Sequence, residues 1–328
     1  MMEKKDLRII FMGTPEFAVE SLKSLVEGGY HVVAVVTQPD KPVGRHQDTL
    51  QAPPVKQYAL SQGLPVLQPV KMKDPDFIEA LRRYEADLQV VVAFRMLPEI
   101  VWAMPRFGTF NVHAALLPQY RGAAPINWAV INGETQTGVT TFFLDHDIDT
   151  GRIIMQEPFT IPDEADVEYV YDGLMHLGAG IAIKTIDKLL ASDGNIASIA
   201  QEDLEAQHGV LHHAPKIFKE TCRIAVGQPV KKVYDFVRGL SPYPGAWTEI
   251  QKAEGKLQVL KVFKSTKTGK AIPAGTTPGT LRVEGKSLLL ACADEWLQLD
   301  VIQISGKKRM EAKDFLNGVR DIESYHVI

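Results

Sequence analysis

Short apolar runs alternate with amphipathic stretches through the first half of the chain, and this alternation limits the fold more than any other feature of the sequence. Strands that alternate with helices along a chain form a parallel sheet covered by helices. The sequence therefore predicts a doubly wound α/β domain with a mostly parallel sheet. The predicted strands are residues 7–12, 31–37, 87–94 and 109–113, and the predicted helices are residues 75–84, 124–132 and 167–190.

The second half has a different pattern, with one helix followed by several short strands. The helix is expected at residues 230–240 and ends at a turn rich in Pro and Gly. Short strands separated by glycine and charge are typical of small β-barrels, and the five-stranded oligonucleotide-binding (OB) barrel is the obvious candidate. The expected strands are residues 246–250, 257–263, 279–283, 287–291 and 296–304.

A polar stretch without a sustained hydrophobic period separates the two patterns. It covers residues 191–215 and contains His208, His212 and His213. No Cys or carboxylate completes a recognisable ligand set there, so we expect no metal site. We predict an α/β domain at residues 1–195, a linker at 196–214 and an OB-like β-barrel domain at 215–328.

Composition indicates an ordinary soluble globular protein. Of its 328 residues, 45% are hydrophobic and 23% are charged, a balance typical of such proteins. No apolar run approaches membrane-spanning length, and the charged start of the chain lacks the features of a signal peptide. Cys222 and Cys292 are expected as reduced thiols. We therefore expect a cytoplasmic protein that does not enter a membrane, and a monomer because no coiled-coil seam is visible.

The net charge of −4 hides an asymmetry between the two parts of the chain. Residues 1–210 contain 17 Lys and Arg against 28 Asp and Glu, a net charge of −11. Residues 211–328 contain 19 against 12, a net charge of +7. A basic segment attached to an acidic body is the pattern expected when one part binds a polyanion. A solvated surface with scattered lysines is an equally good explanation of charge alone.

Polar side chains suited to acyl transfer stand at the end of a predicted strand. In an open parallel sheet the active site lies outside the carboxyl ends of the strands. Asn111 and His113 are two residues apart on one strand, so their side chains face the same side. The amide can donate to an oxyanion, and the imidazole can carry charge or a proton. A carboxylate would orient the ring, and spacing does not separate the candidates Asp145, Asp147 and Asp149.

The turn after the first predicted strand argues against a dinucleotide-binding enzyme. Residues 13–17 lie where a Rossmann fold places its glycine fingerprint, but the three-glycine spacing is missing. No acidic partner for a ribose follows the second strand. A Rossmann-like domain is therefore expected without a nicotinamide cofactor.

The segment that holds the polar side chains resembles the folate-dependent formyltransferases. Residues 107–151 contain Asn-x-His, then Leu-Leu-Pro, then Ile-Asp-Thr-Gly, in the order of that family's motifs. The resemblance implies that Asn111, His113 and Asp149 are catalytic, and it selects Asp149 from the three acids. It also implies 10-formyltetrahydrofolate as the formyl donor, no metal, and a tetrahydrofolate that lies against Ala115, Leu116, Leu117 and Pro118.

Three further segments resemble the branch of this family that acts on methionyl-tRNA. They are IIFMGTPEFA at residues 9–18, TQPDKPVGR at residues 37–45 and SGKKRM at residues 305–310. Together with the basic C-terminal third, they imply that initiator methionyl-tRNA is the acceptor. The residues implied in tRNA binding are Lys41, Arg45, Lys307, Lys308 and Arg309.

The chain departs from the family pattern at three places. Ala115 replaces the usual serine, which removes a hydroxyl contact and leaves backbone contacts to the folate. Residues 94–98 are one shorter than the family's segment along the pterin pocket. Residues 46–50 lack the lysines that usually follow Arg45, and this weakens the expected grip on the tRNA acceptor stem.

Two other functions compete with formylation of tRNA. Sugar-nucleotide N-formyltransferases share the triad and the segments 124–128 and 132–134. The basic C-terminal third and SGKKRM favour RNA over a sugar nucleotide. The second alternative is an RNA-binding protein with an inactive α/β domain, and the intact triad argues against it.

Overall fold

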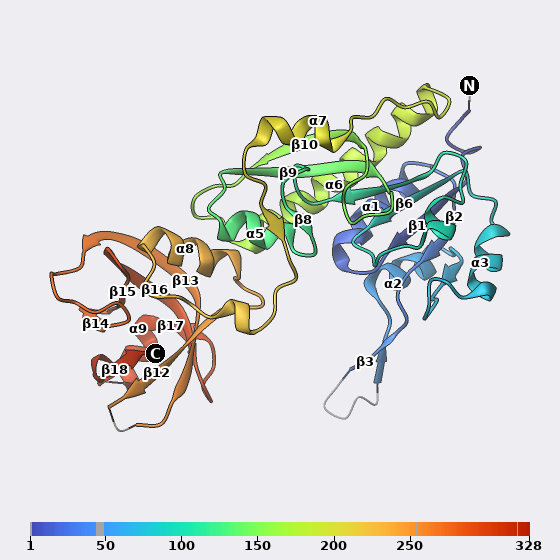
Figure 1. The fold of residues 1–328 in the computed structure, drawn as a ribbon. Helices are drawn as coiled ribbons and strands as arrows, with labels where there is room; N and C mark the ends of the chain where they lie inside the picture. The colour runs from blue at the N-terminus through green and yellow to red at the C-terminus, as the bar shows by residue number, and fades with distance from the viewer. Residues whose placement is uncertain (1, 44–48, 254, 320) are drawn as a thin grey trace. The chain divides into compact units, whose positions relative to one another are not determined.

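The computed structural model describes residues 2–43, 49–253, 255–319 and 321–328. The chain forms two compact units, whose ribbons are drawn in Figure 1. Each unit is assembled from three separate stretches of sequence, so the units alternate along the chain. The predicted domain borders at residues 195 and 214 stay a prediction. The first unit comprises Met1–Gly122, Gln136–Thr160 and Tyr171–His213, and the second comprises Ala123–Thr135, Ile161–Val170 and Ala214–Ile328.

A seven-stranded sheet forms the centre of the first unit, with the order β10-β9-β7-β6-β1-β2-β5. The five strands from β7 to β5 are parallel, and β9 and β10 extend the sheet in antiparallel pairing. The predicted doubly wound, mostly parallel fold is therefore confirmed. The strands are β1 (Ile9–Gly13), β2 (Val32–Val36), β5 (Val66–Leu67), β6 (Leu88–Val92), β7 (Thr109–His113), β9 (Gln136–Phe143) and β10 (Ile153–Thr160).

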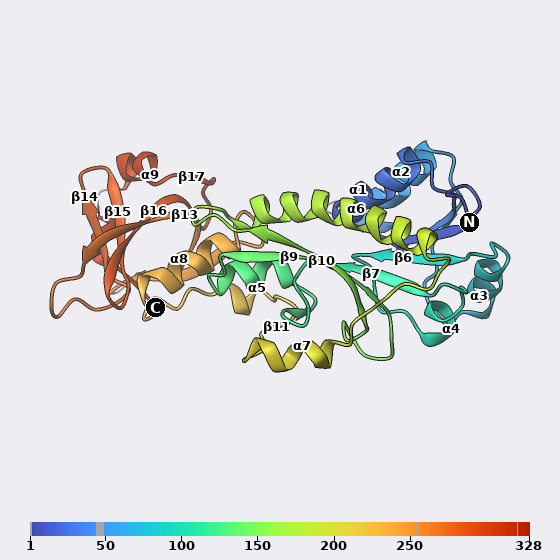
Figure 2. The ribbon, with the colours of Figure 1, turned by 90° about the horizontal axis from the view of Figure 1, so that it is seen from above.

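Helices cover both faces of this sheet, and Figure 2 shows α1 and α6 on one face and α3 and α4 on the other. Ile10 and Met12 of β1 pack in one cluster with Phe77 and Leu81 of α3. Because side chains alternate along a strand, a strand covered on both faces must be apolar throughout. This explains the continuous apolar runs of β1 and β2. The helices are α1 (Glu16–Glu27), α3 (Pro75–Arg82), α4 (Glu99–Trp102) and α6 (Val167–Ala191).

The long helix α6 is fixed against the strands that carry the polar residues of interest. A Cβ on Gly178 would lie 3.3 Å from Val112 of β7, so the helix approaches that strand closely. Thr185 of α6 shares a buried hydrogen bond of 2.8 Å with Thr141 of β9. Although α6 runs for 25 residues, neither it nor any other helix in the described ranges has the length and apolar character to span a bilayer.

Several elements of the first unit have no clear signal in the sequence. After two buried residues, the edge strand β10 alternates partly buried and exposed residues, and it contains Pro158, so it lacks the apolar run of a central strand. Helix α7 lies within the segment that was predicted as a linker. The other elements form a hairpin and the helix that follows it. These elements are β3 (Lys41–Val43), β4 (Thr49–Gln51), α2 (Pro54–Ser61) and α7 (Gln201–His208).

The second unit contains the predicted barrel-like sheet, but with more strands than predicted. Seven antiparallel strands form it, not the five expected from the pattern. The sheet nearly closes, because Thr280 bridges His326 and the amide of Val327 donates to Gly279 across 3.1 Å. The strands are β12 (Ala246–Lys252), β13 (Gln258–Ala271), β14 (Leu281–Glu284), β15 (Ser287–Ala291), β16 (Glu295–Ile304), β17 (Met310–Glu311) and β18 (Tyr325–Val327).

The second unit also includes a helix from the middle of the sequence. Helix α5 (Pro125–Ile131) packs against α8 (Val230–Gly239), and Ile131 belongs to the same hydrophobic cluster as the barrel core. The side-chain amide of Asn127 donates to the carbonyl oxygen of Gly239 across 2.9 Å. Cys222 and Cys292 lie in this core as free thiols. The cluster therefore joins two helices that are separated by about 100 residues in the sequence.

Replacing Gly239 by alanine is expected to destabilise the second unit by about 1 to 3 kcal/mol, the usual cost of overpacking. A Cβ there would lie 2.6 Å from Cγ1 and 2.7 Å from the backbone nitrogen of Ile131. The matched control is Gly318→Ala, at the last residue of α9 (Ala312–Gly318), where a Cβ meets nothing within 4 Å. Urea unfolding followed by tryptophan fluorescence measures both. Equal unfolding midpoints for the two variants would contradict the close α5–α8 packing.

Candidate active site

The predicted catalytic side chains lie at the edge of the sheet where parallel α/β folds bind their ligands. Strand β1 has β2 on one side and β6 on the other, so the strand order reverses there. Ligands bind outside the carboxyl ends of the strands near such a reversal. Asn111 pairs with Val91 of β6, and His113 is the last residue of β7. Both residues therefore stand on the second strand from the reversal, His113 at its carboxyl end and Asn111 two residues before it.

His113 is buried and held in one orientation. Its side chain is 6% exposed, and its Nε2 lies 2.9 Å from the carbonyl oxygen of Tyr120. Because a carbonyl oxygen only accepts hydrogen bonds, Nε2 must carry a proton. Its Nδ1 faces the carboxylate of Asp149, with 3.8 Å between Nδ1 and Oδ2. Nδ1 is therefore the ring nitrogen that lies next to a negative charge.

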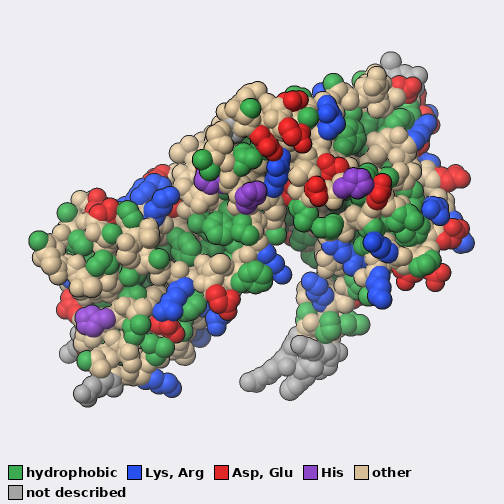
Figure 3. All heavy atoms as spheres, in the orientation of Figure 1, with side chains coloured by type: hydrophobic (Ala, Val, Ile, Leu, Met, Phe, Trp, Pro, Cys, Tyr) green, Lys and Arg blue, Asp and Glu red, His purple; other side chains and the backbone are tan. Residues whose placement is uncertain are grey.

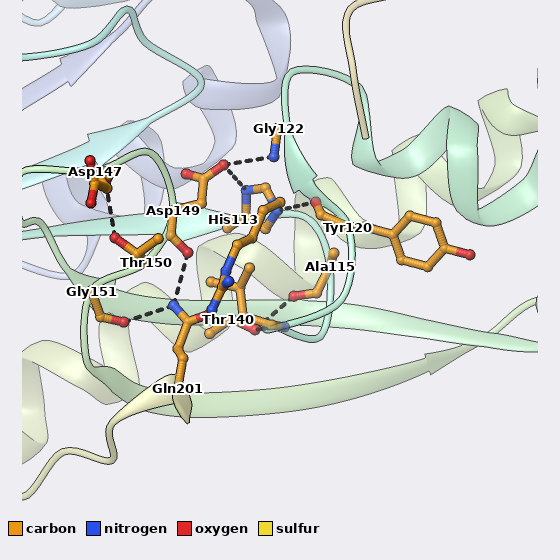
Figure 4. A network of polar contacts seen from close by, with 12 residues as sticks. His113, Ala115, Tyr120, Gly122, Thr140, Asp147, Asp149, Thr150, Gly151 and Gln201 are labelled. Atoms are coloured by element: carbon orange, nitrogen blue, oxygen red, sulfur yellow. Dashed lines mark hydrogen bonds and ion pairs between the residues drawn. The ribbon is translucent and has the colours of Figure 1, made fainter. Parts of the chain in front are cut away.

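A backbone amide holds the Asp149 carboxylate beside the imidazole ring, as Figure 4 shows. Its Oδ2 accepts a hydrogen bond of 2.9 Å from the amide of Gly122, and its side chain is 12% exposed. The other two candidate acids are exposed and build the turn. Asp145 accepts hydrogen bonds from Thr150 and from the amide of Asp147. Of the three acids, the structure brings only Asp149 to the imidazole.

Backbone strain surrounds His113. Tyr120 has φ 59° and Asp149 has φ 58°, in the left-handed region that non-glycine residues rarely adopt. Such conformations cost of order 1 to 3 kcal/mol each and persist where the surrounding structure enforces them. Both residues contact the imidazole, one by its carbonyl oxygen and one by its carboxylate. Strained backbone residues that contact the same side chain are typical of a functional site.

Asn111 carries an unsatisfied polar group. Within the described residues, its Oδ1 is buried and has no hydrogen-bond partner. An unpaired buried polar atom costs about 1 to 3 kcal/mol, so natural proteins rarely keep one without use. Rotating the amide by 180° exchanges its oxygen and nitrogen. The same position can therefore offer a donor or an acceptor to a ligand.

The loop that follows His113 is fixed by two side chains of the antiparallel strands. Thr140 donates to the carbonyl oxygen of Ala115 across 2.6 Å and accepts from the amide of Leu117. Gln156 donates to the carbonyl oxygen of Leu117 across 2.7 Å. Of the predicted folate contacts, the side chains of Ala115, Leu117 and Pro118 are buried and only Leu116 is partly exposed. A ligand at this loop would therefore meet backbone and Leu116.

A pocket opens beside the loop that carries Asp149. It has a volume of about 820 Å³, and its lining includes Met96, Leu97, Trp102 and His146. Ligand pockets usually have volumes of about 300 to 1,000 Å³. The wall of the pocket includes residues of segment 94–98, and the family resemblance implies that the pterin lies along this segment. No three His, Cys, Asp or Glu side chains among the described residues are placed to hold a metal ion.

One of the two predicted tRNA-binding residues of the first unit, Lys41, is the first residue of β3. Lys41 is exposed and pairs with Gln51, whereas Arg45 lies outside the described residues. The base of the hairpin is anchored by Asp40, which accepts hydrogen bonds from Lys56 and Gln68. Those hydrogen bonds, with that from Lys56 the larger cause, hold the pKa of Asp40 below its usual value. Figure 3 shows Lys and Arg side chains beside this hairpin.

The predicted tRNA-binding residues of the second unit form an exposed turn between β16 and β17. Lys307, Lys308 and Arg309 are all exposed. The guanidinium of Arg309 lies over the ring of Phe263, 4.1 Å from its centroid, and the ammonium of Lys307 lies over Phe315 at 5.5 Å. Stacking on a ring leaves the edge of a guanidinium free to donate. The turn therefore presents positive charge to solvent, and two of its side chains lie over aromatic rings.

The structure adds a residue that the sequence did not indicate. The side chain of Gln201, from α7, donates to the carbonyl oxygens of Asp149 and Gly151, both across 2.8 Å. A single Gln at the start of a polar helix gives no pattern that sequence reading detects. Only the three-dimensional contact connects it to the site.

Comparison with known proteins agrees with the resemblance. The family model described as "Formyl transferase" matches residues 7–186, and the model described as "Formyl transferase, C-terminal domain" matches residues 216–320. A methionyl-tRNA formyltransferase of Parabacteroides distasonis is 58% identical over 327 residues, which cover 99% of this chain and 100% of that protein. One of Bacteroides fragilis is 57% identical over 325 residues, covering 99% and 98%.

Solved structures share the fold at much lower identity. An N-formyltransferase from Helicobacter canadensis, solved with folinic acid and dTDP-3-aminofucose, has a TM-score of 0.63 and 18% identity, covering 89% of this chain and 98% of that one. Likeness at that identity supports the architecture alone. The matches of both family models and the near-full-length identity to curated relatives identify the family. The chain belongs to the methionyl-tRNA formyltransferase family.

Proposed function

We propose that this protein transfers the formyl group of 10-formyltetrahydrofolate to the α-amino group of methionine on initiator tRNA. The products are N-formylmethionyl-tRNA, used to initiate translation, and tetrahydrofolate. The observation that carries the proposal is the 58% identity to a methionyl-tRNA formyltransferase over 99% of this chain and 100% of that protein. The cytoplasm as the site of action and the monomeric state belong to the same proposal.

In the proposed mechanism, the neutral amine attacks the formyl carbon and a new C–N bond forms. The carbonyl oxygen gains negative charge, which the amide of Asn111 stabilises as a preorganised donor and the positive charge of a His113 imidazolium stabilises electrostatically. The Tyr120 carbonyl and the Asp149 carboxylate, one at each ring nitrogen, stabilise that cation. Asp149 helps relay the proton lost by the amine, through water, to N10 of the folate. The bond to N10 then breaks and the oxyanion returns to a carbonyl.

The folate is proposed to lie against the loop of Ala115, Leu116, Leu117 and Pro118. Because most of these side chains are buried, backbone groups and Leu116 would make the contacts. Ala115 in place of the family's usual serine is consistent with that arrangement, since no side-chain hydroxyl is required. Thr140 and Gln156 would hold the loop in shape for the ligand.

The tRNA is proposed to contact Lys41, Arg45 and the basic turn of the second unit. Replacing Lys308 by glutamine is expected to raise the KM for methionyl-tRNA and to leave kcat unchanged, because a phosphate contact supports binding and not chemistry. The slope of log affinity against log salt should fall by about 1. The control is Lys286→Gln, an exposed lysine of the same unit in the turn between β14 and β15. Equal salt slopes for both variants would contradict the assignment of this turn.

One assay tests the proposed function against its alternatives. The protein is incubated with 10-formyltetrahydrofolate and either methionyl-tRNA or an amino-sugar nucleotide, and the formylated product is identified. We expect formylation of methionyl-tRNA only. Formylation of the amino-sugar nucleotide alone would overturn the proposal in favour of the sugar-nucleotide branch. Salt-sensitive tRNA binding without any formylation would indicate a binding protein.

A further inference from the structure

We propose that Gln201 is a positioning residue for formyl transfer, which sets the Asp149 carboxylate relative to the His113 imidazole by holding the backbone of the Asp149 turn. This inference rests on the proposed function. Gln201 touches neither the imidazole nor the carboxylate in Figure 4, where its dashed contacts run to the backbone on either side of Thr150. Its effect on the reaction would therefore pass through Asp149.

Both ends of the Gln201 side-chain amide form hydrogen bonds. Its Nε2 donates to the carbonyl oxygens of Asp149 and Gly151, each at 2.8 Å. Its Oε1 accepts from Nε of Arg121 at 3.0 Å and from Nη2 at 2.7 Å. The residue is 1% exposed. Because carbonyls accept and guanidinium groups donate, these partners fix which end of the amide is oxygen and which is nitrogen.

The backbone of the turn that Gln201 holds is strained. Asp149 has a left-handed φ of 58°. A Cβ on Gly151 would lie 1.7 Å from the carbonyl oxygen of Phe143, so the chain passes too close there for any side chain. Two hydrogen bonds from one buried amide join the carbonyl groups on either side of Thr150. Loss of those bonds would allow the turn to relax and the carboxylate to move.

The other end of Gln201 connects to the segment that holds the imidazole. Arg121 directly follows Tyr120, whose carbonyl oxygen accepts from Nε2 of His113. The next residue, Gly122, donates its amide to Oδ2 of Asp149. Glu205, one turn further along α7, pairs with Arg121 at 2.7 Å and holds the guanidinium in place. Gln201 and Arg121 thus link the two strained backbone segments on either side of the ring.

Gln201 lies outside the residues that the family models match. It lies between the two stretches that the family models match, which end at residue 186 and resume at residue 216. Helix α7 would then have a task in catalysis beyond joining one part of the chain to another. A buried glutamine with satisfied hydrogen bonds can also serve stability alone, so the test must separate the two roles.

The test compares Gln201→Met, which keeps the length of the side chain but removes its hydrogen bonds, with Gln201→Glu, which keeps the contact to Arg121 and removes the two donors. Both are expected to lower kcat by roughly tenfold to a hundredfold, as displacement of a catalytic group by about 1 Å can do. The KM values for both substrates should change less than twofold. The control is Gln207→Met in the same helix, whose exposed amide contacts only the carbonyl of Asp203 among the hydrogen bonds described.

A double-mutant cycle with Asp149→Ala decides the pathway of the effect. If Gln201 acts through Asp149, adding Gln201→Met to Asp149→Ala should cause no further loss of kcat. A full additional loss of kcat in the double variant would overturn the positioning role. Wild-type kcat in Gln201→Met and in Gln201→Glu, together with a lowered melting temperature, would overturn it as well. The proposed function is judged separately, since it fails if the wild-type protein does not formylate methionyl-tRNA, whatever the variants do.

Discussion

Replacing Asp149 by alanine is expected to lower kcat for formyl transfer by about a hundredfold or more, with folate affinity nearly unchanged. The carboxylate faces Nδ1 of His113 across 3.8 Å in a site where both groups are nearly buried. Without that negative charge, an imidazolium there loses its closest counter-ion, and the proposed proton relay to N10 loses its acceptor. Removal of such a group from a catalytic triad typically costs several orders of magnitude. Steady-state kinetics with methionyl-tRNA and equilibrium binding of tetrahydrofolate measure the two quantities.

The chain supplies its own control for this prediction, since three aspartates share one loop. Asp147→Ala removes an exposed carboxylate two residues away, and the hydrogen bond from its backbone amide to Asp145 does not depend on its side chain. We expect it to retain kcat within about twofold. Asp145→Ala is a weaker control because its Oδ1 accepts from Thr150 and helps to shape the turn. Similar kcat values for Asp149→Ala and Asp147→Ala would remove Asp149 from the proposed mechanism.

The sequence predicted the parts of the fold and site that depend on local periodicity. The apolar runs of β1, β2 and β6 occur because helices bury both faces of the sheet, so the runs were visible without a structure. The spacing of Asn111 and His113 followed from the two-residue period of a strand. The choice of Asp149 did not follow from spacing, because three acids alternate in the same turn. The structure separates them by what each carboxylate contacts.

Features that depend on tertiary contacts had no sequence signal. Helix α5 was predicted correctly as a helix, but its packing on α8 depends on the close approach at Gly239, which no pattern reveals. The barrel-like sheet was predicted with five strands because β17 and β18 are only two and three residues long. Gln201 is one polar residue in a polar helix. Its importance comes from two carbonyl groups about 50 residues earlier in the chain.

These failures share a physical cause. Periodicity reports how a segment is buried, whereas the site is built from backbone groups whose position depends on other segments. The carbonyl of Tyr120 and the amide of Gly122 both contact the proposed catalytic residues, and neither contact involves the side chain of that residue. A backbone group has the same chemistry at every position, so its use leaves no trace in the sequence. The left-handed φ of Tyr120 and Asp149 is the structural trace of that use.

Replacing Asn111 by alanine is expected to lower kcat by about a hundredfold to a thousandfold, the usual loss when one preorganised oxyanion donor is removed. Its buried Oδ1 has no partner within the described residues, so the truncation removes an unsatisfied group and should not reduce the free energy of unfolding by more than about 1 kcal/mol. The folate Kd should stay close to that of the wild type, because the amide is proposed to act on charge that develops during the reaction.

The control for this variant is Asn195→Ala, which removes an exposed amide from the same unit. It should leave kcat, folate affinity and stability close to wild type. Near-normal kcat in Asn111→Ala would contradict the oxyanion role. A large loss of stability in that variant would show instead that the amide has a structural partner. If Asn111 had a structural role, the folded protein would need its amide before substrate binds, and Asn111→Ala would lose stability. Loss of kcat with stability and folate affinity retained therefore indicates a role in the reaction.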